Sequence, residues 1–319
     1  MHRSQGFNSF DHFNAFDHGW NVDFRAAQAG DYIAHIEQFV GNRVLVNIGT
    51  FDQGTLQKGS TPRGMRTFAL PMMLGGRATW LDYEVETQSL MLFPNSGELS
   101  CLADGTMKML TLSVEEDLVE EVGNTQLQNA TPVSRSEQVG ALESDYWLQL
   151  QRRVRMLITF NSRYGKLPES NNWSAYMEEE LAASFVSCLP QAANSCGPLK
   201  PSAAARNTRH AISHIMDNLG QPLSTGSICR VVGCSRRTLE TSFKRSSGYS
   251  IQSFIKHQRL AHCREELVKS APGTVTVTSV ARQWGFWHMG QFSMDYRKLF
   301  AEKPSSTLAR SPLRPFYLN

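Results

Sequence analysis

The sequence predicts a multidomain α+β protein, in which a β-rich barrel or sandwich is followed by helices and then by an all-α domain with two helix-turn-helix motifs. Three observations predict this architecture. Short segments with strand composition fill residues 1–130, two amphipathic helical periods follow in residues 131–189, and one helix–glycine–helix pattern occurs twice in residues 206–310. With 319 residues, 41% of them hydrophobic, the chain is long enough to form separate cores.

Seven short segments of the first domain, residues 1–130, have the composition of β-strands. They are rich in β-branched and aromatic residues, and Gly, Asn, Asp or Pro turns separate them. This spacing is typical of a small barrel or sandwich. The expected strands are 31–39, 44–51, 66–73, 78–86, 89–93, 98–102 and 107–112.

The same part of the chain lacks the residue patterns of common enzymes. It has no His-x-His pair, no Gly-x-Ser-x-Gly motif and no Walker-type phosphate loop. We therefore expect no catalytic residue and no metal site, and a binding or sensing role instead. The histidines of this part are His2, His12, His18 and His35.

Two amphipathic helices are expected in the next region, residues 131–189. Apolar side chains recur there at intervals of three and four residues, which gives each helix one apolar stripe that can cover the barrel. The stripes are Trp147, Leu150, Val154 and Leu157 in the first helix, and Trp173, Met177, Leu181, Phe185 and Cys188 in the second. Small, turn-forming residues at 190–205 then predict a linker.

Near the C-terminus one short pattern occurs twice, at residues 224–244 and 277–297. In each copy a short helix reaches a glycine, Gly233 or Gly285, that can take a positive φ and turn the chain. A second helix follows, with two core positions four residues apart and therefore on one face. These core pairs are Leu239 with Phe243 and Phe292 with Tyr296. Between the copies, Ser250 and a helical apolar period predict one long connecting helix.

The second helix of each copy carries polar and basic residues outside its core face. Such side chains can bond base edges or phosphates. The residues expected to contact the groove are Arg236, Arg237, Thr241, His288, Gln291 and Ser293, with Lys244 as a further DNA contact. Those expected to contact phosphates are Arg245, Lys256 and Arg297.

The charge distribution also favours DNA as a partner. Residues 201–319 hold 17 Lys and Arg against 6 Asp and Glu, a net charge of +11, whereas residues 1–200 carry −8. A basic domain on an otherwise acidic protein is expected for phosphate contact and counterion release. The competing interpretation is a basic face for an acidic protein or a membrane surface.

On these residues, segment 206–310 resembles the DNA-binding domain of the AraC/XylS family of transcription regulators. The resemblance rests on the run Ser235 to Leu239, Phe243-Lys244-Arg245, Gly248, Arg259-Leu260, Val280-Ala281, Gly285-Phe286, Phe292, Tyr296-Arg297, Phe300 and Pro304-Ser305. One departure is Ala301, where the family usually has glycine.

The resemblance implies two helix-turn-helix units on one connecting helix, with a recognition helix from each in successive major-groove segments. It implies, more loosely, a cupin-like N-terminal barrel that senses a small-molecule effector, and a homodimer formed through the helices of residues 131–189. Since the family consists mostly of activators, the expected partners are promoter DNA, an effector and RNA polymerase.

The chain has no run of eighteen apolar residues and no apolar stretch for export, so we expect no membrane association and a cytoplasmic location.

Three alternatives stay open for the effector. The family favours a sugar or small metabolite inside the barrel. Against it, a Gly/Pro-rich run places Lys58, Arg63 and Arg66 close together, with Trp80 and Asn95 downstream, and paired arginines can fork onto phosphate. This run loosely resembles the cyclic-dinucleotide motif of PilZ-type modules, with arginines three rather than four apart. The third alternative is a solvated loop without a ligand.

Two other functions compete with ligand-gated regulation. A methyl-accepting DNA-repair protein can carry the same DNA-binding array, but it needs a reactive cysteine with zinc-ligand spacing beside it, and the N-terminal half has only Cys101. A constitutive architectural DNA binder would differ only in lacking a ligand response. The six cysteines of the chain show no metal or disulfide spacing, so we expect buried reduced thiols ahead of a redox sensor.

Overall fold

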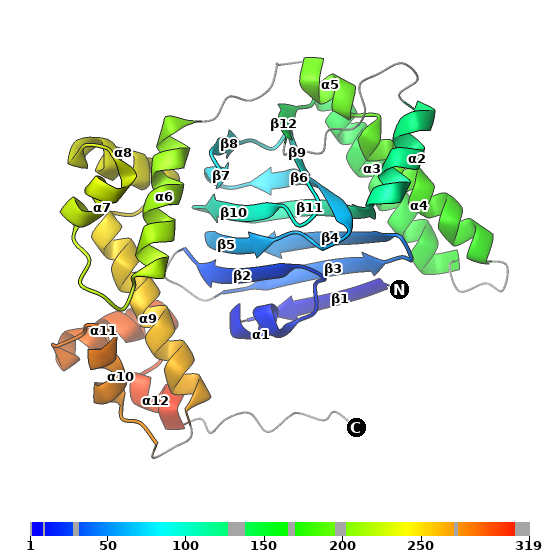
Figure 1. Cartoon of the computed structure of the whole chain (residues 1–319). Coiled ribbons are helices and arrows are strands. Elements are labelled where there is room, and N and C mark those ends of the chain that lie inside the picture. Colours follow the sequence, from blue (N-terminus) through cyan, green and yellow to red (C-terminus); the bar gives the residue numbers. More distant parts are fainter. Residues whose placement is uncertain are drawn as a thin grey trace.

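The chain folds with its β-rich part between two helical layers, as the computed structural model shows (Figure 1). The structure describes residues 2–8, 10–27, 32–126, 138–164, 170–194, 202–270 and 274–309. Residues 195–201 of the expected linker, which include Cys196, lie outside the described residues. So do residues 311–319, which the domain boundaries leave as a C-terminal tail. Two antiparallel sheets come first and an all-helical domain comes last, so the predicted α+β fold class is confirmed.

The two sheets contain all the strands of the described residues, and every described strand pair is antiparallel. The larger sheet has the order β1 (His2–Phe7), β3 (Ala34–Val40), β4 (Val44–Phe51), β11 (Met107–Glu115), β6 (Met65–Leu74), β9 (Ser89–Phe93) and β12 (Gln138–Ala141). The smaller sheet has the order β2 (Asn21–Ala26), β5 (Thr55–Ser60), β10 (Glu98–Ala103), β7 (Ala78–Trp80) and β8 (Tyr83–Val85).

Side chains along each strand alternate between the two faces of the larger sheet, and each face has its own hydrophobic core. In β4, Val46 and Ile48 belong to the core under the helices, whereas Phe51 belongs to the core between the sheets. Successive side chains of a strand point to opposite faces, so neighbouring residues reach different cores. The inner core also takes aromatic residues of α1 (Phe10–Ala15), which precedes β2.

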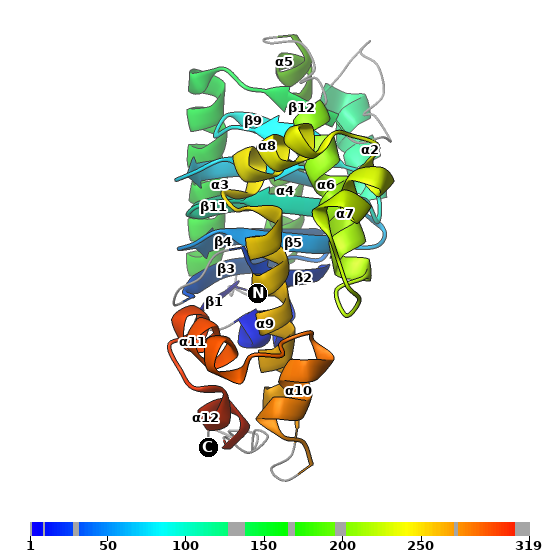
Figure 2. The same cartoon turned by 90° about the vertical axis from the view of Figure 1, so that its left-hand side faces the viewer.

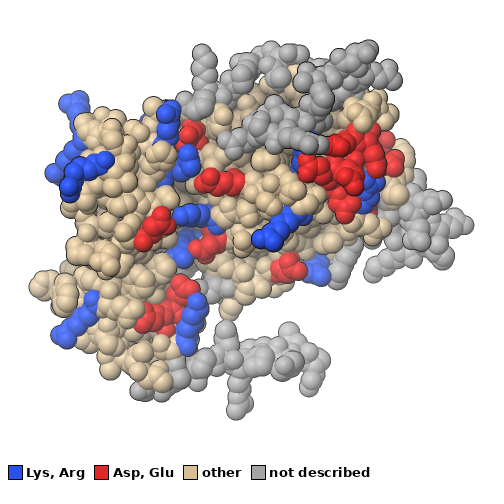
Figure 3. Space-filling model, viewed as in Figure 1, with Lys and Arg blue, Asp and Glu red and all other residues tan. Residues whose placement is uncertain are grey.

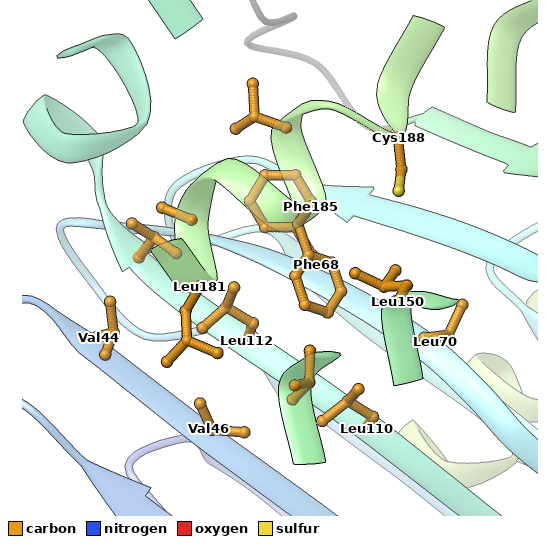
Figure 4. Close-up of a cluster of buried hydrophobic side chains, with 14 of the residues drawn as sticks. Val44, Val46, Phe68, Leu70, Leu110, Leu112, Leu150, Leu181, Phe185 and Cys188 are labelled. Atoms are coloured by element: carbon orange, nitrogen blue, oxygen red, sulfur yellow. The ribbon is translucent and has the colours of Figure 1, made fainter. Parts of the chain in front are cut away.

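Helices α2 (Glu116–Gln126), α3 (Ser144–Tyr164) and α4 (Ser170–Val186) cover the outer face of the larger sheet (Figure 4). The described residues of both expected apolar stripes are buried there, except Trp147, which is partly buried against the same core. The rings of Phe68 and Phe185 lie 5.5 Å apart. The side chain of Trp173 lies outside the described residues. The two helices therefore cover the sheet, which was one of the expected roles.

The C-terminal domain packs on the opposite side of the sandwich, against the smaller sheet. Figure 2 shows α9 running from the first helical unit to the second, in front of the strands. The helices are α6 (Ala203–Asp217), α7 (Thr225–Val232), α8 (Arg236–Ser247), α9 (Ile251–Lys269), α10 (Val277–Gln283), α11 (Met289–Phe300) and α12 (Pro304–Ala309).

Several sequence expectations need correction. Strands β1, β2, β5 and β12 were not expected, and the expected strand 78–86 is two strands, because Leu81 takes a positive φ of 49° between them. The expected linker begins with helix α5 (Leu189–Asn194), and α6 already starts at Ala203. Arg66 belongs to strand β6 and not to a loop.

Candidate nucleic-acid interface

The first helix-turn-helix unit is built by local hydrogen bonds that its sequence dictates. Helix α7 starts with a capping box between Ser224 and Ser227, which satisfies exposed backbone donors. Gly233 then takes a left-handed φ of 74° and ends α7. The side chain of Ser235 accepts a hydrogen bond from the backbone of Thr238 at 3.1 Å and starts α8. The chain therefore turns sharply between two short helices.

The second unit repeats this frame. Thr276 and Ser279 form the capping box of α10, and Gly285 takes a φ of 81°. His288 is the N-cap residue of α11, although its side chain makes no capping hydrogen bond. The hydroxyl groups of Tyr296 and Thr307 lie 2.9 Å apart, which ties α11 to α12. The expected repeat of helix, glycine turn and helix is present in both copies.

Helix α9 joins the two units because its two halves belong to two cores. Ile251, Phe254 and Ile255 pack in the core of the first unit with Leu239 and Phe243. The second half of α9 enters the core of the second unit, which holds Leu260, Cys263, Leu267, Phe292 and Tyr296. One rigid helix thus fixes the spacing between α8 and α11, as a reader of two adjacent groove segments requires.

Most residues expected to contact DNA lie on the exposed sides of α8 and α11. The exposed ones are Arg236, Arg237, Thr241, Lys244, Arg245, His288, Gln291, Ser293 and Arg297. Arg236 donates a 2.8 Å hydrogen bond to Glu240 in the same helix. Lys and Arg gather over α7 and α8 at the upper left of the molecule, and Asp and Glu gather over α2 at the right (Figure 3). This distribution agrees with the opposite charges of the two domains.

Two expected phosphate contacts are already paired with carboxylates. Arg245 donates from Nη2 to both oxygens of Glu84 in the β-rich domain, at 2.8 and 2.7 Å. Lys256 on α9 lies 3.2 Å from the carboxylate of Asp295 on α11. Neither cation is therefore held ready for phosphate in this arrangement, and Arg245 would have to leave Glu84 first.

Sequence reasoning missed two exposed apolar residues at the second unit. The side chain of Met294 on α11 is 62% exposed, and Trp287, just before the helix, is 71% exposed. The signal that could have found Met294 is helical phase, because it lies on the side opposite the buried Phe292 and Tyr296. Neither Met294 nor Trp287 was predicted, because the expected DNA contacts were polar or basic residues.

The C-terminal domain contacts the β-rich domain through charged and apolar residues. Asp82 lies 2.9 Å from Arg209 and 3.8 Å from Arg206, both on α6. On α9, Gln258 donates a 3.3 Å hydrogen bond to the carbonyl of Ala26, and His262 bonds to Arg25. Burial, and then the charge of Arg25, lower the pKa of His262. The neutral imidazole is favoured in this contact.

An apolar cavity lies between the two sheets, with a volume of about 70 Å³. Both tryptophans of its lining, Trp20 and Trp80, have indole N–H groups with no hydrogen-bond partner among the described residues. The few polar side chains in the lining include His18 and Gln57. Burial lowers the pKa of His18, so its neutral form is favoured. The cavity therefore has a mainly apolar wall, and two of the residues in that wall have a buried, unpaired indole N–H group.

The four residues proposed for an anionic effector do not converge on one site. Arg66 is 1% exposed and donates to Glu116 at 2.8 and 3.0 Å, so its guanidinium group is not presented to solvent. Trp80 lines the inner cavity. Arg63 and Asn95 are exposed, and Asn95 accepts a 2.7 Å hydrogen bond from the backbone of Gly64. The expected single loop with three cations is not formed, because two strands divide it.

Cys101 sits in the same cavity lining. Burial raises its pKa to about 12, and a buried thiol of this kind is a poor nucleophile.

The described residues contain no group of three possible metal ligands. Among the described helices, none has both the length and the apolar character that crossing a bilayer requires.

Comparison with known proteins identifies the C-terminal domain. The family model described as "Helix-turn-helix domain" matches residues 228–310. Over 106 residues the chain is 33% identical to the probable thc operon regulatory protein of Rhodococcus erythropolis, a match that covers 33% of this chain and 32% of that protein. Over 103 residues it is 32% identical to the XylDLEGF operon transcriptional activator 3 of Pseudomonas putida, covering 32% and 31%. The match thus spans about a third of these relatives.

Two solved structures are also similar. A probable AraC family transcriptional regulator from Rhodopseudomonas palustris CGA009 is 36% identical, over 34% of this chain and 98% of that one, with a TM-score of 0.32. The AraC-like transcriptional activator CuxR is 16% identical over 81% of this chain and 94% of that one, with a TM-score of 0.41. Since both TM-scores are low, sequence identity within the C-terminal domain carries the conclusion. The C-terminal domain is therefore a helix-turn-helix domain of the AraC type, similar to the corresponding part of these transcription regulators.

Proposed function

We propose that the protein is a sequence-specific DNA-binding regulator, and an activator of transcription, whose promoter binding responds to a small molecule in the β-rich domain. The observation that carries the proposal is the pair of capped helix-turn-helix units that α9 holds together, each with an exposed recognition helix. A basic C-terminal domain on an acidic remainder supports DNA as the partner. RNA polymerase is the further partner of an activator.

The cavity between the sheets favours an apolar effector that carries a hydrogen-bond acceptor. An acceptor could satisfy the indole N–H groups of Trp20 and Trp80, which are otherwise unpaired among the described residues. The volume of about 70 Å³ is roughly half that of a 150 Å³ cavity known to take up benzene, so only a small ligand fits without side-chain movement. A cyclic dinucleotide is too large and too charged for it, and could bind only elsewhere, for example at Arg63 and Asn95.

Strands β5 and β10 offer a direct route from the cavity to the DNA-binding domain. Gln57 and Cys101, which face each other across the two strands, line the cavity. Their neighbours Leu56 and Leu102, also a cross-strand pair, pack in the core of the first helix-turn-helix unit. A ligand that displaces these strands therefore moves residues that contact the C-terminal domain. Such coupling requires only that the ligand binds one arrangement of the domains better than the other.

The ion pair between Glu84 and Arg245 supports the same coupling. While it is formed, the β-rich domain occupies an arginine that is expected to contact phosphate. Glu84→Gln should release Arg245 and tighten effector-free DNA binding by up to about fivefold, since an exposed ion pair contributes up to about 1 kcal/mol. Glu86→Gln, which alters a neighbouring exposed carboxylate, is the matched control and should change nothing. Equal affinities of the two variants would remove this contact from the mechanism.

A homodimer is the proposed assembly, formed through α3 and α4. The sides of these helices that do not cover the sheet carry exposed apolar residues, namely Leu148, Met156 and Phe160 on α3 and Tyr176 on α4. Met156→Glu should lower the dimer fraction in sedimentation equilibrium, whereas Arg152→Glu on the same helix tests whether added charge alone has this effect. A monomer in the unaltered protein would contradict the proposal.

The ligand proposal is tested by native mass spectrometry of the full chain purified from its source. A bound molecule of low mass is expected, and Ala69→Leu, which fills the cavity, should abolish it. Met73→Leu, on the exposed end of β6, is the control for changes at this sheet. Retention of the molecule by Ala69→Leu would place the effector outside the cavity. Binding of zinc by the purified protein would favour the DNA-repair alternative instead.

A further inference from the structure

Helix α11 presents an apolar side chain where a DNA-reading helix usually presents polar ones. Its buried residues Phe292, Tyr296 and Leu299 define the inner side. At 100° per residue, Met294 projects from the middle of the opposite side. Its side chain is 62% exposed, so most of it is left uncovered by the described residues. Met294 thus lies on the side of α11 that faces away from its own core.

Position by position, the two recognition helices differ at their outward residues. Counting from the buried pairs, Met294 corresponds to Thr241, and Gly290 corresponds to Arg237. Where α8 carries a guanidinium group, α11 therefore carries no side chain. A Cβ added at Gly290 would meet nothing within 4 Å, so one helical turn before Met294 the surface is open. A flat, apolar group could approach the backbone of α11 closely there.

Trp287 adds a second apolar group, just before the start of the helix. It immediately precedes the N-cap residue His288, and its side chain is 71% exposed. In the described C-terminal domain the exposed large apolar residues are Val231, Trp287 and Met294, so one of the three lies just before α11 and another in its middle. Leaving both in water is unfavourable, and burial against a ligand would recover that free energy.

We infer that the second helix-turn-helix unit reads thymine by its 5-methyl group, through Met294 and Trp287. This inference rests on the proposed DNA-binding function and specifies the base that one half of the protein recognises. The thymine methyl is the apolar group that base pairs present in the major groove. Methionine suits it because the thioether side chain is flexible and polarizable and adapts to a small apolar partner. The first unit, with Arg237 and Thr241, reads by hydrogen bonds instead.

The experiment uses the full chain and a duplex obtained by selection from random DNA. Each thymine of the half-site that α11 faces is replaced by deoxyuridine, which removes the methyl group alone. One or two of these replacements should weaken binding by roughly fourfold, the effect of one buried methyl-sized group. In Met294→Ala the thymine duplex should bind more weakly, and the preference for thymine over deoxyuridine at the affected position should vanish. Met294→Leu should keep that preference.

Controls separate this inference from the function on which it rests. Thr241→Ala, at the corresponding position of α8, should leave the deoxyuridine effect unchanged. Thermal unfolding shows whether each variant is folded, and the salt dependence should not change in Met294→Ala because no charge is lost. Failure to select any duplex would contradict the proposed function itself.

Three outcomes with a selected duplex would overturn the inference. One is equal affinity of the unaltered protein for thymine and deoxyuridine throughout that half-site. Another is an unaltered thymine preference in both Met294→Ala and Trp287→Ala. The third is normal DNA binding by these variants with loss of a protein complex, which would assign the apolar pair to a protein partner.

Discussion

The two helix-turn-helix units share one frame and differ in what they expose. In both, a Ser or Thr capping box starts the first helix, a glycine with positive φ turns the chain, and a buried pair anchors the second helix. On their outward sides, α8 has Arg237 and Thr241 where α11 has Gly290 and Met294. Buried and turn positions thus maintain the scaffold, while the outward positions are free to set what each unit recognises.

The largest effects should come from the shared frame. Leu239→Ala should lower the free energy of unfolding by about 2–5 kcal/mol, and Phe292→Ala by about 3–5 kcal/mol, because both side chains are buried in full. Urea unfolding of the full chain measures both. Each variant should lose DNA binding together with its folded unit. If the Phe292→Ala protein stays folded and only its sequence preference changes, Phe292 does not have the structural role that Leu239 has in the first unit.

Next in size is the loss of a polar contact from the first unit. Arg237→Ala should weaken binding to the selected duplex by about 1–3 kcal/mol and relax its sequence preference, as loss of a bidentate base contact does. Fluorescence anisotropy with selected and scrambled duplexes checks this. Gly290→Ala, at the corresponding position of α11, should have a much smaller effect on the first half-site. Equal losses on both duplexes would reassign Arg237 to phosphate contact.

The third difference is between Lys256, which forms an ion pair, and Lys244, which forms none with the described residues. Lys244→Ala removes an exposed cation from α8 and should lower the slope of log affinity against log salt by about 0.9. Lys256→Ala should lower it less, because Asp295 already neutralises part of this charge in the free protein. Titrations at several sodium chloride concentrations give both slopes. A larger change for Lys256 would mean that its ion pair opens on DNA.

The smallest effect concerns how the two recognition helices end. Helix α8 ends at Gly248 with a φ of 73°, whereas α11 ends at Ala301 with a φ of 55°. A left-handed alanine is strained by about 1–2 kcal/mol, and glycine loses more entropy on folding, so Ala301→Gly should stabilise the second unit by about 1 kcal/mol or less. Gly248→Ala should destabilise the first unit by about 1 kcal/mol. Thermal unfolding of both variants tests the sign.

Sequence alone predicted the parts that local pattern determines. Turn glycines and helical apolar periods predicted both helix-turn-helix units and the apolar stripes of α3 and α4, and the N-cap residue Ser250 predicted the start of α9, because these signals act within a few residues. Arg66 was misplaced because its burial depends on Glu116, fifty residues away. The pair of Glu84 and Arg245 spans 161 residues and leaves no local signal. Strand β5 was missed because its outward residues face a second domain rather than solvent.

The central claim is that α8 and α11 read two adjacent segments of one duplex. Selection of binding sites from a random duplex library by the full chain, followed by salt titration of the best site, tests it most directly. The predicted result is a two-part site whose segments lie about one helical turn, roughly 10 base pairs, apart, with affinity that falls as salt rises. Selection that enriches no sequence, or binding that does not respond to salt, would contradict it.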